Sequence, residues 1–143
     1  MSEDVTYDII YIEDNEFDIE LTLRAFKKLN LEASIKVIKD GEEAVSFFDH
    51  LKALNTALPK LILLDIKLPK VNGLEILQKI KSDEKLKIIP VIMLTYSKEE
   101  KDLKEAYSFG ANSYILKALT SEQFQEVVRL IKTYWLELNY QLR

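Results

Sequence analysis

Five polar side chains in this sequence stand at the ends of short apolar runs, where they could act together on a phosphate or a metal ion. They are Glu13, Asp14, Asp65, Thr95 and Lys117. Apolar runs of four or five residues predict buried strands, and the carboxyl ends of parallel strands border the crevice where open α/β sheets bind ligands. We therefore expect three carboxylates, a hydroxyl and an amine to converge at one edge of a sheet.

The three carboxylates predict a site for a hard divalent cation. Like charges held close together repel, and a cation relieves the repulsion. Mg2+ fits this set because it uses one or two carboxylates, keeps several waters and shares phosphate oxygens. A zinc site is excluded, since the chain has no cysteine and its single histidine, His50, lies in a predicted helix.

Asp65 is the residue that we expect to carry the chemistry. An aspartate can act as a nucleophile and form an acyl phosphate. Phosphoryl transfer needs mainly positioning and neutralisation of charge, which a metal and an ammonium group supply. On this interpretation Asp65 accepts the phosphoryl group, and Asp14 and Glu13 form the metal site. Lys117 and Thr95 then bind the phosphoryl oxygens. Each residue alone is compatible with an ordinary surface position, and their combination favours the functional interpretation.

An alternation of strand and helix signals places these residues. The predicted fold class is α/β, a flavodoxin-like (βα)5 doubly wound parallel sheet with strand order 2-1-3-4-5 and an extended C-terminal helix. The predicted strands are 7–12, 34–38, 61–64, 91–94 and 113–116. The predicted helices are 15–29, 41–51, 73–82, 97–109 and 121–142, and a longer irregular connection covers 52–60. The second strand alternates Lys36 with apolar neighbours, which predicts an edge position.

Local signals mark the ends of several helices. The predicted N-caps are Asn15, Asp40, Asn72, Ser97 and Thr120. Ser97 and Thr120 also open capping boxes, because a glutamate or glutamine stands three residues after each of them. Gly110 predicts a left-handed residue that closes the fourth helix.

Length and composition bound the class of protein. A chain of 143 residues is large enough for one domain with its own core. The net charge of −4 argues against a general nucleic-acid or anionic-membrane surface. Residues 1–7 lack the apolar run of a signal peptide, and no stretch approaches the ~20 apolar residues that would span a bilayer. We therefore expect a single cytoplasmic domain, residues 1–143, without an output domain.

Together these features resemble the response-regulator receiver domain over nearly the whole chain. The resemblance rests on the acidic pair Glu13–Asp14, Asp65 followed by Pro69 and Gly73, Thr95 after an apolar strand, and Lys117 after Tyr114-Ile115-Leu116. It implies a two-component phosphorelay protein that accepts a phosphoryl group on Asp65 from a phosphohistidine of a sensor histidine kinase. It further implies that the domain catalyses its own phosphoryl transfer and hydrolysis.

The resemblance also implies roles for individual residues. The implied Mg2+ ligands are Asp14, Asp65, the backbone carbonyl of Lys67 and, through water, Glu13. Thr95 would move toward the phosphoryl group while the aromatic ring of Tyr114 turns inward. Such a pair of states would be biased by a local change of charge.

Two departures from the family pattern bear on rate and signal. Lys117 is followed by Ala118, where the family usually has a proline after a cis bond. A cis bond before a non-proline residue costs about 3 kcal/mol, so we expect this bond to be trans or strained. Tyr96 is bulkier than the small residue common after the threonine and would hinder access. Ala118 keeps open an alternative function, a receiver-type interaction module that works without phosphorylation.

The last predicted helix carries a candidate interaction surface. If it runs continuously over 121–142, its length would be about 33 Å, whereas a typical strand spans only ~17 to 20 Å. Its predicted inner stripe is Phe124, Val127, Val128, Ile131, Trp135, Leu138 and Leu142. Leu136 and Tyr140 lie off that stripe, and with Trp135 they would offer a surface to a partner or to a second copy of the chain.

The connection before Pro59 and the aromatic C-terminal segment are similar to those of single-domain regulators that pair with phytochrome-type histidine kinases. We accordingly expect such a kinase as the partner, and neither a nucleic acid nor a membrane. Two other classes are excluded. A haloacid-dehalogenase-like phosphatase needs a second acid two residues after its nucleophile, where this chain has Lys67. A flavodoxin-like FMN carrier needs a hydroxyl-rich loop where Glu13 and Asp14 would repel the phosphate.

Overall fold

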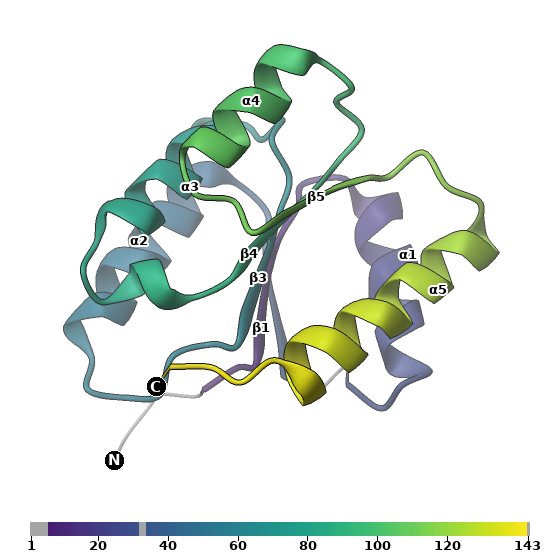
Figure 1. The fold of residues 1–143 in the computed structure, drawn as a ribbon, viewed down its shortest axis with the longest axis horizontal. Helices are drawn as coiled ribbons and strands as arrows, with labels where there is room; N and C mark the ends of the chain where they lie inside the picture. Colours follow the sequence, from purple (N-terminus) through teal and green to yellow (C-terminus); the bar gives the residue numbers. More distant parts are fainter. Residues whose placement is uncertain (1–5, 32–33, 143) are drawn as a thin grey trace.

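The computed structural model describes residues 6–31 and 34–142, and its centre is a five-stranded parallel sheet (Figure 1). The strands are β1 (Ile9–Ile12), β2 (Ile35–Ile38), β3 (Leu61–Leu64), β4 (Val91–Thr95) and β5 (Ser113–Leu116). They follow the order β2-β1-β3-β4-β5, and every neighbouring pair is parallel. The predicted fold class and strand order are therefore confirmed.

Helices cover both faces of the sheet. They are α1 (Glu16–Lys27), α2 (Gly41–Ala53), α3 (Gly73–Ser82), α4 (Glu100–Ser108) and α5 (Ser121–Ile131). Helices α1 and α5 lie against one face, and α2, α3 and α4 lie against the other (Figure 1). A short 3-10 turn, η2 (Leu86–Ile88), precedes β4 and is not predicted by the sequence pattern. In the described part of the chain, no helix has both the length and the apolar character needed to span a membrane.

The central strands are apolar on both sides because helices cover both sides of the sheet. Every residue of β1, β3 and β4 is buried. Alternate residues feed opposite layers, so that Ile10 and Ile62 belong to one core cluster and Ile9 and Leu61 to the other. Strand β2 lies at the edge and its Lys36 is only partly buried, as the alternation predicts.

Side-chain caps fix where four of the helices begin. Asn15, Asp40 and Asn72 each accept a backbone N–H of the first turn, at 2.9, 2.7 and 2.7 Å respectively. Thr120 and Gln123 form the reciprocal pair of hydrogen bonds of a capping box. These side chains satisfy N–H groups that a helix leaves unpaired at its start. The four caps confirm the sequence prediction at these positions.

The capping box predicted at Ser97 is wrong. Helix α4 begins at Glu100, with Glu99 at the N-cap and no side-chain cap. The hydroxyl of Ser97 instead donates to the carboxylate of Asp102, with 2.6 Å between Oγ and Oδ2. The other end of the helix matches the prediction, since Gly110 has a φ of 105° and lies just beyond the C-cap.

The last helix is shorter and wider than predicted. After α5 the chain continues as a π-helical segment, η3 (Lys132–Leu138), and the helix ends there. Because a π-helix bonds residues five apart instead of four, its side chains rotate off the α-helical stripe. Leu136 and Trp135 pack against a core cluster, whereas Leu138 is 68% exposed. The outward position predicted for Leu136 and the inward positions predicted for Leu138 and Leu142 are therefore wrong.

The chain end folds back along the sheet instead of overhanging it. The side-chain amide of Gln141 donates to the backbone carbonyl of Lys60 at 2.6 Å. Lys60 directly precedes β3, so the tail lies at the amino ends of the strands. The predicted protruding surface reduces to Tyr140 and its neighbours, with the Tyr140 side chain fully exposed.

Gly73 allows α3 to approach the end of β3 closely. A Cβ atom placed on Gly73 would lie 2.0 Å from the backbone carbonyl oxygen of Asp65. The N–H of Gly73 also donates to the carbonyl of Ile66 at 2.8 Å. The start of α3 is thus held directly against the loop that carries Asp65.

Replacing Gly73 by alanine should lower the free energy of unfolding by about 1–3 kcal/mol, because the new methyl group overlaps the Asp65 carbonyl and the backbone must shift. Urea denaturation of the Gly73→Ala variant measures the loss. The matched control is Ser108→Ala on the exposed surface of α4, which should change stability by less than about 0.5 kcal/mol. Equal stability of the two variants would contradict the close approach.

Candidate functional site

The predicted acidic residues come together at the carboxyl ends of β1 and β3. Glu13, Asp14 and Asp65 each offer a carboxylate oxygen, and these oxygens all lie within 4.8 Å of one another. Glu13 and Asp65 are buried, with 1% and 7% of their surface exposed, whereas Asp14 is exposed. The cluster therefore combines two desolvated carboxylates with one that solvent reaches.

The carboxylate of Asp65 is held on both oxygens. The backbone N–H of Ile66 donates to Oδ1 at 2.7 Å. The ammonium group of Lys117 donates to Oδ2 at 3.2 Å. These two contacts fix the orientation of the Asp65 side chain at the end of β3.

Lys117 is the cation that these acids share. Its ammonium group donates to Glu13, to Asp18 at 3.0 Å and to Asp65 at 3.2 Å. Burial by itself would lower the pKa of Lys117, but the hydrogen bond to Glu13 and the charge of Asp65 outweigh burial and raise it. The peptide bond between Lys117 and Ala118 is trans, and Lys117 still reaches Asp65.

Glu13 holds its proton more tightly than an ordinary glutamate. Burial and then the negative charge of Asp65 raise the pKa of Glu13 to about 7. The hydrogen bonds from Lys117 and from the backbone N–H of Asn15 act in the opposite direction. The site gathers three carboxyl groups beside one lysine, and the proton that Glu13 takes up near pH 7 reduces this excess of negative charge.

Thr95 and Tyr114 lie around the connection that follows β4. Thr95 is completely buried, and its hydroxyl oxygen accepts the backbone N–H of Ser97 at 3.3 Å. The hydroxyl of Tyr114 donates to the backbone carbonyl of the same Ser97 at 2.9 Å. Both residues are thus tied to one loop residue. The movements that the family resemblance implies for Thr95 and Tyr114 stay predictions.

Lys67 occupies the loop two residues after Asp65. Its ammonium group lies 3.7 Å from a carboxylate oxygen of Asp102 on α4 and so points toward that helix. Within residues 6–31 and 34–142, its backbone carbonyl accepts no hydrogen bond. The role of this oxygen as a Mg2+ ligand, which the family resemblance implies, stays a prediction.

The set of donors fits Mg2+. Every candidate ligand is an oxygen atom, and the exposure of Asp14 leaves room for the waters that this ion retains. A divalent cation would also offset the negative charge of Glu13 and Asp65 that Lys117 leaves unbalanced. His50, the single histidine, is exposed on α2 and is not among these ligands.

Asp18 belongs to the site, although it is not among the site residues predicted from the sequence. Its carboxylate accepts hydrogen bonds from Lys117 and, at 3.1 Å, from the hydroxyl of Tyr96. The first turn of a helix that follows a parallel strand faces the carboxyl edge of the sheet. An acid in the first turn of α1 was therefore the signal that could have identified Asp18.

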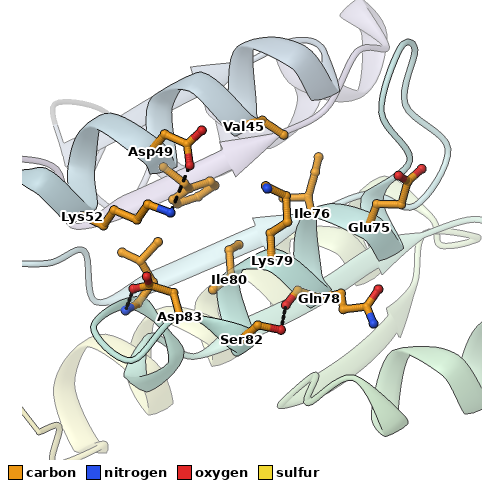
Figure 2. A pocket seen from close by; sticks show the side chains of 12 residues that line it. Val45, Asp49, Lys52, Glu75, Ile76, Gln78, Lys79, Ile80, Ser82 and Asp83 are labelled. Carbon is orange, nitrogen blue, oxygen red and sulfur yellow. Dashed lines mark hydrogen bonds and ion pairs between the residues drawn. The ribbon is translucent and has the colours of Figure 1, made fainter.

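A separate pocket lies between α2 and α3, away from the acidic site (Figure 2). It has a volume of about 430 Å3, and its apolar floor includes Val45, Ile76 and Ile80. Charged side chains surround it, among them Lys52 and Asp49, which pair at 3.2 Å (Figure 2). None of the predicted site residues lines this pocket, so it takes no part in the acidic site.

Comparisons with known proteins agree with this geometry. Residues 9–129 match the family model described as the response regulator receiver domain. The chain is 40% identical over 131 residues to the probable methanogenesis regulatory protein FilR2 of Methanothrix harundinacea, covering 92% of this chain and 84% of that protein. It is 34% identical over 130 residues to the response regulator Rcp1 of Synechocystis sp., covering 90% of this chain and 88% of Rcp1.

Solved structures show the same similarity. The phosphorylated cyanobacterial phytochrome response regulator RcpA superposes with a TM-score of 0.86 at 35% identity, over 97% of this chain and all of that one. The Mn2+-bound form of Rcp1 superposes with a TM-score of 0.80 at 30% identity, over 94% of this chain and 98% of that one.

Replacing Lys117 by alanine should lower the free energy of unfolding by roughly 3 kcal/mol in the presence of a chelator, because buried carboxylates lose their shared cation. Saturating Mg2+ should recover part of this loss, since an ion that binds the folded state stabilises it. Urea denaturation with EDTA and with Mg2+ measures both terms. The control, Lys104→Ala on exposed α4, should match the wild type. A Lys117→Ala variant as stable as this control would show that the ion contacts matter little.

The Mg2+ affinity of the wild type should rise from pH 6 to pH 8. A proton occupies Glu13 below its pKa of about 7 and competes with the cation, so affinity falls as the pH falls. Calorimetric titration should give at most about a tenfold change over this range. Glu13→Gln carries no titrating group and should flatten the dependence of Mg2+ affinity on pH. Glu42→Gln, at an exposed position on α2, should keep that dependence. An unchanged profile in Glu13→Gln would assign the proton to another group.

Proposed function

The chain belongs to the response regulator receiver family, and from that membership we propose that Asp65 is its phosphoryl acceptor. In this proposal the donor is a phosphohistidine of a sensor histidine kinase. Asp14, Asp65 and the carbonyl of Lys67 would hold Mg2+, with Glu13 acting through water. Phosphorylation would then change the surface that the domain presents to partners.

The setting of Asp65 carries this proposal. Its carboxylate stands at the end of a central strand, hydrogen-bonded to a buried ammonium group at 3.2 Å and within 4.8 Å of two more carboxylates. One oxygen is held by a backbone N–H, which fixes the direction of the other. A fixed carboxylate beside a cation is the arrangement that nucleophilic attack on phosphorus requires.

The proposed transfer conserves atoms and electrons. A carboxylate oxygen of Asp65 attacks phosphorus, a P–O bond forms, and the P–N bond to the donor histidine breaks with its electron pair left on the imidazole. Lys117 and Thr95 bind oxygens of the transferred group. Bound Mg2+ would supply neutralisation of the negative charge on those oxygens. Attack by water on the same phosphorus would later release inorganic phosphate and restore Asp65, so that the chain catalyses both steps itself.

A phytochrome-type histidine kinase is the partner that we propose. Two relatives support this partner by their names: RcpA is a phytochrome response regulator, and RtBRR is a bacteriophytochrome response regulator. The second is 38% identical to this chain, with a TM-score of 0.73. We further propose that the protein is cytoplasmic. Association of two copies through the exposed residues around Tyr140 is part of the proposal, and light scattering decides it.

The alternative function, an interaction module that works without phosphorylation, rests on Ala118. In the structure Lys117 contacts Asp65 with Ala118 beside it, so this substitution leaves the lysine in place. No other feature of the site favours the alternative.

Incubation with acetyl phosphate or phosphoramidate and Mg2+ should add a single phosphoryl group to the wild type, measured as intact mass. The adduct should be absent in Asp65→Asn and absent when EDTA removes the ion. The control, Asp83→Asn, removes one carboxylate next to η2 and should be modified like the wild type. A folded wild-type protein that binds Mg2+ but gains no mass would instead support the module that works without phosphorylation.

A further inference from the structure

Asp18 and Tyr96 contact Lys117 in addition to the acids of the proposed metal site. Oδ2 of Asp18 accepts the Lys117 ammonium group at 3.0 Å, a shorter contact than the 3.2 Å to Asp65. Oδ1 of Asp18 accepts the hydroxyl of Tyr96 at 3.1 Å. The ring of Tyr96 covers the same ammonium group, with 4.8 Å between Nζ and the ring centroid. We call Asp18 and Tyr96 the lysine clamp.

The backbone of Asp18 is held by contacts that do not involve Lys117. Its backbone N–H donates to the side chain of Asn15 at 2.9 Å, and its backbone carbonyl accepts the hydroxyl of Tyr11 at 3.4 Å. Its side chain is 7% exposed. The carboxylate is therefore a buried charge on an anchored, short side chain, whereas Lys117 has a long, flexible side chain and is the partner that would move.

The ammonium group of Lys117 has three N–H donors, and three carboxylates occupy its surroundings. A phosphoryl group on Asp65 needs one of these donors, so one existing contact has to weaken. Glu13 and Asp65 are also candidate metal site residues, whereas Asp18 is not in that cluster. Asp18 is thus the carboxylate that competes for the lysine without contributing to cation binding.

Space around the clamp permits such a movement. A cavity of about 80 Å3 is lined by Asp18, Tyr96 and Lys117, among other residues of α1 and of the connection before α5. Its charged partners therefore fix the position of the ammonium group, and close packing does not confine it on the side of the cavity. A change in those partners can shift it.

We propose that Asp18 is a positioning residue that holds Lys117 back from the phosphoryl group and so limits how tightly the site binds that group, while the hydroxyl of Tyr96 shares the charge of Asp18 and moderates this hold. This inference rests on the proposed function. It assigns the clamp to regulation of that site: the stronger the hold of Asp18 on the lysine, the weaker the binding of a phosphoryl group at Asp65.

The test uses beryllofluoride, a phosphoryl analogue, titrated into the Mg2+-saturated protein, together with a separate titration of Mg2+ alone. Asp18→Asn keeps the shape of the side chain and removes its charge. Its beryllofluoride affinity should rise by about tenfold, since a charge-assisted contact no longer competes. Its Mg2+ affinity should stay equal or fall slightly, because a negative charge has left the region. A purely structural role would lower both affinities together.

Tyr96→Phe provides the second variant and keeps every charge and the ring over Lys117. Without the Tyr96 hydroxyl, Asp18 has only Lys117 to share its charge and holds the lysine more strongly. The beryllofluoride affinity should therefore fall by roughly threefold. The control Asp83→Asn, which removes a carboxylate far from Lys117, should match the wild type in both titrations.

The outcomes separate the two proposals. Equal beryllofluoride affinity in the wild type and Asp18→Asn, or a rise in Tyr96→Phe, would overturn the clamp while leaving the proposed function intact. A wild-type protein that binds Mg2+ but no beryllofluoride would overturn the proposed function and the clamp with it.

Discussion

One buried ammonium group, that of Lys117, keeps the carboxyl edge of this sheet together. Folding brings to it an acid from the end of β1, one from the first turn of α1 and one from the end of β3. Without a shared cation these charges would repel one another in surroundings that water hardly reaches. The end of β1, the first turn of α1 and the end of β3 therefore meet at this one ammonium group.

The backbone around the site is held differently on its two sides. On the β1 and β3 side, the Asn15 cap and the glycine contact at the start of α3 leave little freedom of movement. On the β4 side, Ser97 joins Thr95, Tyr114 and Asp102 through single hydrogen bonds. The acids therefore lie on a firmly held part of the backbone, and the loop after β4 opposite them is held by only a few separate hydrogen bonds. This arrangement suits a site whose charge changes when a phosphoryl group is added and removed.

The strands and most helix starts could be predicted because their signals are local. Four consecutive large aliphatic residues predict a buried strand, and a capping side chain predicts a helix start, from only a few neighbouring positions. The errors concern residues whose environment comes from elsewhere in the chain. Ser97 bonds Asp102 instead of capping its own helix, and Leu136 turns inward because the helix widens. The acids at the strand ends were identified for the same local reason. Asp18 instead lies in the first turn of α1, and its contacts with Lys117 and Tyr96 show that it belongs to the site.

The wide helical segment at the end of the chain has an optical consequence. It contains Trp135, the single tryptophan of the protein, which is partly buried against the core and packs edge to face with Tyr134 at 4.9 Å between ring centroids. Helix α5, which starts near Lys117 and rises about 1.5 Å per residue, separates this ring from the acids by most of the depth of the sheet. The tryptophan fluorescence of the molecule therefore reports on the chain end, where a docked protein would change it, and should respond little to a cation bound at the far end of the sheet.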